Sequence, residues 1–97
     1  MNPTICEAIR SRRILRFYYG GGYRMVEPHC YGVSTAGHEV LRAYQIGGYS
    51  ESDQPIGWKL FRVLAITGLQ LTTETFASPR PGYNPNDSEM TTIYCRL

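Results

Sequence analysis

The chain has 97 residues, which suits a single domain over residues 1–97 and leaves no room for a two-domain enzyme. Apolar residues make up 42% and charged residues 19% of the chain, a composition that excludes a disordered or collagen-like protein. Ten basic and eight acidic residues give a net charge of +2, which is too small to indicate binding to nucleic acid or to an anionic membrane by itself.

A short helix is expected at the start of the chain, over about residues 3–13. Thr4 and Glu7 match a capping box, and Asn2 before a proline offers an alternative, earlier start. The residues that share one apolar face of this helix are Ile5, Ala8 and Ile9. We expect this face to pack onto the strands that follow.

From residue 14 to about residue 76 the apolar period changes to two, which is typical of strands. Strands are expected over residues 14–19, 23–27, 30–34, 39–46, 58–66 and 69–72. Pro28 is expected to end the second of them, because proline cannot donate to a central ladder. Residues 47–57 are expected to form a polar surface loop, and residues 77–97 an irregular tail with a last strand over 91–95.

This order of elements predicts a mainly β fold with one N-terminal helix. A sheet of about five to seven short strands has to curve strongly to bury its apolar residues and to protect its edges. The expected architecture is therefore a small antiparallel β-barrel of the SH3-like or Sm-like kind.

The cysteines and the N-terminal residues bear on the compartment. Cys6, Cys30 and Cys95 cannot all pair with one another, and none of them stands in a C-x-x-C metal-binding spacing. The first residues lack the pattern of a signal peptide, and no window approaches the roughly 18 apolar residues of a membrane span. We expect a cytoplasmic protein in a reducing compartment, with no membrane partner.

Catalytic residues are scarce. His29 and His38 are the only candidate histidine bases, and neither a G-x-S-x-G motif, a P-loop nor a pair of suitably spaced carboxylates is present. His29 and Cys30 are adjacent, so in a strand they point to opposite faces. We expect a non-enzymatic protein that needs no metal and no cofactor.

Arginine and tyrosine offer a binding surface instead. Arg24, Arg42 and Arg62 each lie within an expected strand, where a cation on a largely apolar face needs a partner. The alternative is that each stem covers the barrel while its charged head reaches water. Eight tyrosines and one tryptophan could stack on bases beside these arginines, although most of the tyrosines are expected to pack in the barrel.

Four stretches of the chain resemble WYL domains, small Sm-like barrels of bacterial transcription regulators and phage-defence systems. They are ICEAIRSRRILRFYY, RMVEPHCYGV, HEVLRAYQIGG and GWKLFRVLAITGLQL, which together cover about residues 5–76. Three positions depart from the family pattern: Glu39-Val40-Leu41 replaces Trp-Tyr-Leu, Ala65 replaces a later arginine, and His29 stands where tyrosine is common.

The resemblance implies a ligand-sensing module for nucleic acid or a nucleotide-like anion. In that role we expect phosphate contacts from Arg24, Arg42 and Arg62, stacking by Tyr44 and Trp58, and hydrogen bonding by His29. Arg62 is expected to emerge beside Tyr44 or Arg42. The alternative function is a protein-interaction or oligomerisation subunit without a ligand of its own, acting with itself or with a separate regulator or effector protein.

Overall fold

The chain begins with a helix whose start is set by Asn2. In the computed structural model, which describes residues 1–97, helix α1 spans Pro3–Ser11. Asn2 Oδ1 accepts hydrogen bonds from the backbone N–H groups of Thr4 at 2.9 Å and Ile5 at 3.2 Å. The earlier of the two expected starts is therefore the one used. The helix ends sooner than expected, because Arg12 adopts a left-handed conformation with φ of 53°.

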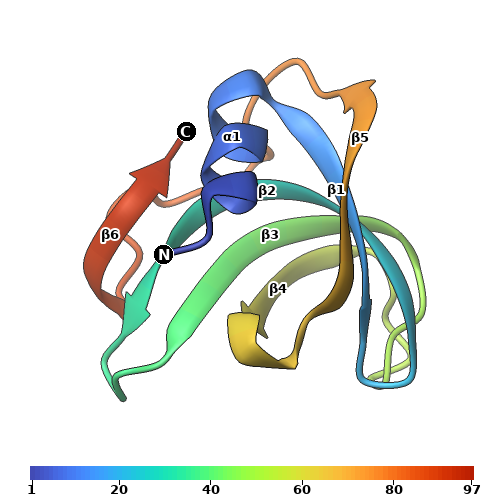
Figure 1. Ribbon diagram of the computed structural model, residues 1–97, viewed down its shortest axis with the longest axis horizontal. Helices are drawn as coiled ribbons and strands as arrows, with labels where there is room; N and C mark the ends of the chain where they lie inside the picture. The colour runs from blue at the N-terminus through green and yellow to red at the C-terminus, as the bar shows by residue number, and fades with distance from the viewer.

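Six antiparallel strands follow, joined by turns and one 3-10 turn (Figure 1). They are β1 (Arg13–Tyr19), β2 (Gly22–Ser34), β3 (Glu39–Gly48), β4 (Gly57–Arg62), β5 (Thr67–Thr75) and β6 (Met90–Arg96), with the 3-10 turn η1 (Val63–Ala65) between β4 and β5. The order across the sheet is β4-β3-β2-β1-β5, and β6 pairs with β2. The expectation of a mainly β, antiparallel fold with one short helix is confirmed.

Strand β2 is longer than the sequence predicts, because it continues through Pro28. Its first half pairs with β1 as far as Val26, and its second half pairs with β6 from Cys30 onward. Pro28 lies between these two pairings, beside a register shift against β3. The missing N–H of proline is tolerated at such an irregularity. The prediction that Pro28 separates two strands was therefore wrong.

The sheet does not close into a hydrogen-bonded barrel. Strands β4 and β5 stand at the two ends of the strand order and do not pair with each other. A side chain bridges part of the gap, since the backbone N–H of Arg62 donates to the Tyr19 hydroxyl at 3.0 Å. The closed barrel that the sequence predicts is thus not confirmed, and the architecture is a strongly curved open sheet.

The core lies on the concave side of this sheet, with α1 over one end of it (Figure 1). The helix contributes the three apolar residues expected from its pattern, and all three are buried. From the strands, Phe17 and Phe61 meet edge to face with centroids 5.0 Å apart. Buried strand residues around them include Leu15, Val26, Tyr31, Leu41 and Ala43.

The two ends of the chain are linked covalently. Cys6 of α1 forms a disulfide with Cys95 of β6, whereas Cys30 is free and buried. The odd number of cysteines did not exclude one pair, and disulfides persist mainly in oxidising compartments. The cysteine count therefore no longer supports a reducing compartment. Helix α1 has neither the length nor the apolar character that a membrane span requires.

Candidate functional site

Four of the six candidate binding residues share one face of the sheet. The β3–β4 register pairs Tyr44 with Trp58, Arg42 with Leu60, and Val40 with Arg62. Side chains at alternate positions of a strand point to the same side, so Arg42 and Tyr44 lie on the same face as Trp58 and Arg62. The opposite face carries Phe61 and its core neighbours.

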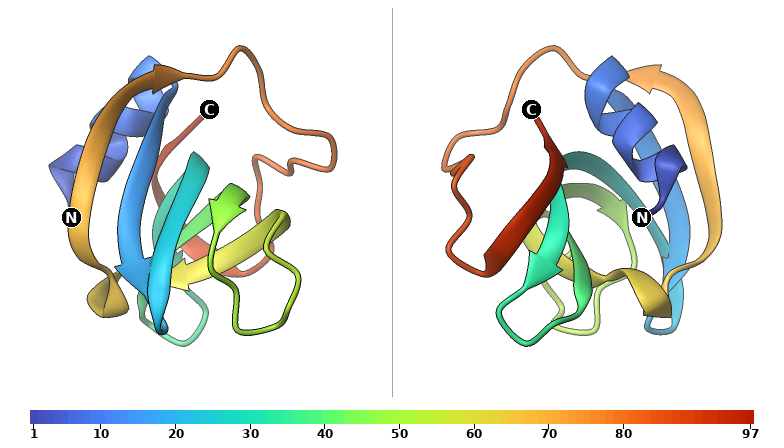
Figure 2. Two further views of the ribbon diagram at one scale, coloured as in Figure 1. Left: turned by 90° about the vertical axis from the view of Figure 1, so that its right-hand side faces the viewer. Right: turned by 60° about the vertical axis from the view of Figure 1, so that its left-hand side comes forward.

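A segment far along the chain covers much of this face. Residues 76–89, here called the tail segment, leave the end of β5 and run beside β3 and β4 before entering β6 (Figure 2). Trp58 Nε1 donates to the Pro81 carbonyl at 3.0 Å, and the Arg80 guanidinium lies 4.7 Å from the centre of the Tyr44 ring. The surface expected to meet a ligand is therefore partly occupied by the chain itself.

An ion pair fastens the tail segment to β2. Arg80 donates to both carboxylate oxygens of Glu27, at 2.7 and 3.0 Å, and the Glu27 side chain is only 5% exposed. A buried carboxylate needs such a partner, because water no longer solvates its charge. This ion pair thus holds the backbone of the tail segment in one position, although the tail segment has no regular secondary structure.

His29 forms a second anchor. Its side chain is fully buried, Nδ1 is 2.8 Å from the Glu27 carbonyl, and Nε2 accepts the backbone N–H of Arg80 at 3.1 Å. These partners require a neutral ring with its proton on Nδ1. Burial lowers the pKa of His29, against the raising influence of the Glu27 carbonyl. Both ring nitrogens are therefore engaged within the chain and are not available to a ligand.

Arg24 also has an internal role. It is 5% exposed, donates to the Tyr19 carbonyl at 3.2 Å and to Gln45 Oε1 at 3.3 Å, and lies near the Tyr19, Tyr49 and Phe61 rings. These contacts satisfy the cation inside one end of the curved sheet. The structure does not bring Arg24 together with the residues on the β3–β4 face.

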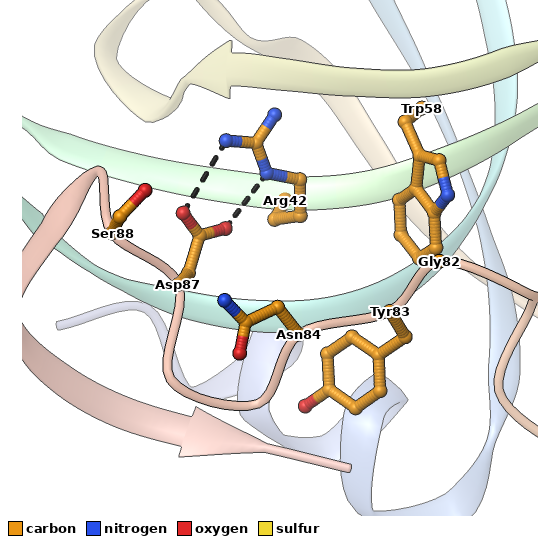
Figure 3. Close-up of a pocket in the computed structure, with 7 residues that line it drawn as sticks. All are labelled: Arg42, Trp58, Gly82, Tyr83, Asn84, Asp87 and Ser88. Carbon is orange, nitrogen blue, oxygen red and sulfur yellow. Dashed lines mark hydrogen bonds and ion pairs between the residues drawn. The ribbon is translucent and has the colours of Figure 1, made fainter.

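The open part of the face is a pocket of about 270 Å³ (Figure 3). Here it is called the Trp58 pocket, and its lining is Arg42, Trp58, Gly82, Tyr83, Asn84, Asp87 and Ser88. Arg42 reaches from β3 to Asp87, with Nε to Oδ2 at 2.7 Å and Nη2 to Oδ1 at 3.3 Å. Burial alone would raise the pKa of Asp87, but the hydrogen bonds from Arg42 and from the Glu89 N–H hold it below its ordinary value.

The Arg42–Asp87 pair decides what this pocket can bind. Because the carboxylate stays ionised beside the guanidinium, the two charges cancel and the pocket offers no net positive charge to a phosphate. It offers the Trp58 ring together with polar groups from Asn84 and Ser88. A flat, polar and uncharged ring is the ligand chemistry that suits an aromatic wall with hydrogen-bonding groups beside it.

Arg62 lies outside this pocket. It stands opposite Val40 at the end of β4 and lines a separate pocket near the β2–β3 turn, rather than emerging beside Tyr44. Of the six expected binding residues, the structure therefore brings together His29, Arg42, Tyr44 and Trp58. Trp58 contacts His29 and Tyr44 directly, with ring centres 4.7 and 5.5 Å apart.

The residues that sequence reasoning missed all come from the tail segment. With Gly82, the side chains of Tyr83, Asn84, Asp87 and Ser88 make up five of the seven lining residues of the pocket, and Arg80 holds the segment in place. The stretch SPRPGYNPND is dense in turn formers and was therefore predicted only to be irregular. Its mixture of aromatic and charged residues in a loop was the one available signal, because binding residues concentrate on loops carried by a rigid sheet.

Cys30 is expected to resist alkylation in the native protein. Burial and the nearby Asp87 carboxylate raise the pKa of this thiol to about 11, so almost none of it is the reactive thiolate at neutral pH. Mass spectrometry after iodoacetamide treatment should find Cys30 unmodified in the native protein and modified in urea. Rapid labelling in the native state would contradict this prediction.

No protein-family model, curated protein or solved structure matches this chain. No group of three or more His, Cys, Asp or Glu side chains is arranged to hold a metal ion. The functional argument therefore depends on the geometry of the Trp58 pocket and its surroundings.

Proposed function

We propose that the protein is a non-enzymatic module that binds an unpaired nucleobase, presented by a nucleotide or by single-stranded nucleic acid, in the Trp58 pocket. The observation that carries this proposal is the placement of the Trp58 ring beside a charge-balanced Arg42–Asp87 pair. Stacking of a base on an aromatic side chain contributes about 1–3 kcal/mol. The polar groups of Asn84 and Ser88 would contact the edge of the base.

A phosphate attached to that base would need a cation outside the pocket. Arg80 provides one, because its side chain is 41% exposed and it lies over Tyr44, whose ring contacts Trp58. Its charge is shared with Glu27, so the contribution of phosphate contacts to affinity is expected to be modest and dependent on salt. In this proposal the stacking contact dominates, which differs from the phosphate role expected for Arg42.

Trp58 gives this proposal a direct optical test, since it is the only tryptophan in the chain. Titration at low salt with adenosine and uridine monophosphates and with short single-stranded DNA should quench its fluorescence in a saturable way. Ribose 5-phosphate, which has no base, should not. Ser88→Ala should weaken binding roughly two- to tenfold, the value of one hydrogen bond.

The matched control is Arg16→Gln, because Arg16 lies on β1 and does not line the pocket. It should bind like the wild type. Absence of quenching by every base-bearing ligand would contradict the proposal. If no ligand quenches the fluorescence and light scattering shows a tight dimer, the protein-interaction alternative is favoured. Two features of the structure support that alternative: Leu64 is 90% exposed, and the outer edges of β4 and β5 are unpaired.

Several expectations from the sequence stay predictions. They are the SH3-like or Sm-like barrel class, a place in bacterial transcription regulation or phage defence, and a cytoplasmic location. The base-binding proposal does not need any of them, because it depends only on the contacts of the tail segment with β3 and β4.

A further inference from the structure

Arg62 differs from the other arginines of the chain. Its guanidinium makes no hydrogen bond, ion pair or aromatic contact, whereas each of the other eight arginine side chains has at least one such partner. Glu89 and His38 likewise have no side-chain partner. These three unpartnered groups line the same pocket.

This second pocket, here called the Arg62 pocket, measures about 350 Å³. Its apolar wall consists of Val40, which is buried, and of Leu60, which packs against the small cluster of Cys30, Val40 and Met90. The polar residues around it include Arg62, His38, Ser34, Thr35 and Glu89. The β2–β3 turn, the end of β4 and the end of the tail segment just before β6 supply these residues, and they lie at one end of the molecule (Figure 1).

Backbone hydrogen bonds fix the walls of the pocket. In the β2–β3 turn the N–H of Ser34 donates to the His38 carbonyl at 2.8 Å, and the Ser34 hydroxyl accepts the N–H of His38 at 3.2 Å. The N–H of Thr35 donates to the Glu89 carbonyl at 3.0 Å, which ties the turn to the chain before β6. The N–H of Arg62 is held by Tyr19. The charged side chains are thus free while the backbone that carries them is fixed.

The charges limit the ligand. Arg62 and Glu89 do not form an ion pair, yet they line one pocket. A simple anion would be attracted by Arg62 but repelled by Glu89. A simple cation would be attracted by Glu89 but repelled by Arg62. A molecule that carries both charges satisfies both groups, and an apolar substituent on it would cover Val40 and Leu60.

We propose that the Arg62 pocket binds a free α-amino acid with an apolar side chain. The carboxylate contacts Arg62, with His38 as a further hydrogen-bonding group, and the ammonium contacts Glu89. The pocket volume is at the small end of the roughly 300–1,000 Å³ range of small-molecule sites, which suits a ligand of this size. This site is separate from the Trp58 pocket and does not depend on base binding there.

The test is a titration of the ¹⁵N-labelled protein followed by NMR. L-Leucine should give saturable shifts at the amides of Thr35, His38, Arg62 and Glu89. Three comparators each lack one feature: 4-methylpentanoate lacks the ammonium, 3-methylbutylamine lacks the carboxylate, and glycine lacks the apolar side chain. Each comparator is expected to bind about tenfold more weakly or worse, since each loses a contact worth a charge-assisted hydrogen bond or a buried side chain.

Two variants test the charges. Arg62→Gln and Glu89→Gln should each weaken leucine binding about ten- to hundredfold, and both should keep the wild-type melting temperature because neither side chain has a partner in the fold. The control Arg16→Gln should bind leucine normally. The proposal is overturned if leucine gives no saturable shift, if 4-methylpentanoate binds as well as leucine, or if the two variants bind like the wild type. These shifts are independent of Trp58 fluorescence, so failure here leaves the base-binding proposal intact.

Discussion

Loss of the Cys6–Cys95 disulfide is expected to lower the free energy of unfolding by roughly 3–5 kcal/mol. The bond joins residues separated by 89 positions, which is nearly the whole chain. In the chain-entropy description, a loop of that length removes many conformations from the unfolded state, and the stabilisation rises slowly with loop length. For a domain of this size, that is a large part of a typical total of about 5–15 kcal/mol.

The location of the disulfide gives a second reason to expect that its loss destabilises the protein, this time in the folded state. It connects α1, which covers one end of the core, to β6, which pairs only with the second half of β2. Without the bond, each of these peripheral elements is held by its own contacts alone. We therefore expect the ends of the chain to open before the β1–β2–β3 centre of the sheet.

Urea denaturation with and without dithiothreitol measures this effect. The wild type should lose stability on reduction, whereas a Cys6→Ala/Cys95→Ala double variant should have low stability in both conditions and should not respond to the reductant. Equal stability of the oxidised and reduced wild type would contradict the prediction. Because a cytoplasm reduces most disulfides, the size of this effect also determines how stable the protein would be in the compartment that the sequence predicts.

Local patterns predicted the local structure well. The strand expected over residues 39–46 lies within β3, where Leu41 and Ala43 are on the core face and Arg42 and Tyr44 are on the opposite face. This succeeded because the two-residue period of a strand depends only on neighbouring residues. The helix pattern succeeded for the same reason, and the competition between its two starts was decided by the side chain of Asn2.

The contacts that build the candidate site could not be predicted in this way. The Glu27–Arg80 and Arg42–Asp87 pairs join residues 53 and 45 positions apart, and no local spacing encodes such pairs. Arg42 was expected to need a partner, but the sequence pointed to a ligand rather than to Asp87 of the tail segment. The residue that pairs with a buried charge is determined by which elements the tertiary fold places beside it, and not by the local sequence.

Mild acid is expected to release the tail segment by protonating His29. In the folded protein Nε2 accepts the Arg80 N–H, so a proton on Nε2 would replace an acceptor with a second donor at that position. The groups packed around the ring are Glu27, Arg80, Trp58, Phe76 and Tyr83. Among them only Glu27 favours a charged imidazole, through its carbonyl and its carboxylate, and that carboxylate is already paired with Arg80.

The direction of the effect follows from the lowered pKa of His29. Between the ordinary value of about 6.5 and the lower folded value, the unfolded chain binds a proton that the folded chain does not. Stability is therefore complete above pH 6.5 and falls as the pH drops towards the folded pKa, by at most about 1.4 kcal/mol per pH unit for one group. Asp87 affects stability only at lower pH. Its pKa in the folded protein lies below the ordinary value of 3.8, so its contribution to stability is lost only as the pH falls below 3.8 towards the folded pKa.

Denaturation curves between pH 7 and pH 4.5 should separate the effect of His29 from that of Asp87. Trp58 fluorescence serves as a local reporter, because the Trp58 ring contacts both His29 and the Pro81 carbonyl. The wild type should lose stability across that interval, and the Trp58 signal should change with it. His29→Gln, which cannot titrate, is expected to be less stable at pH 7 but nearly independent of pH over the same interval. Since all other titrating groups are shared by the two proteins, the same slope in both would show that His29 does not hold the tail segment in a pH-dependent way.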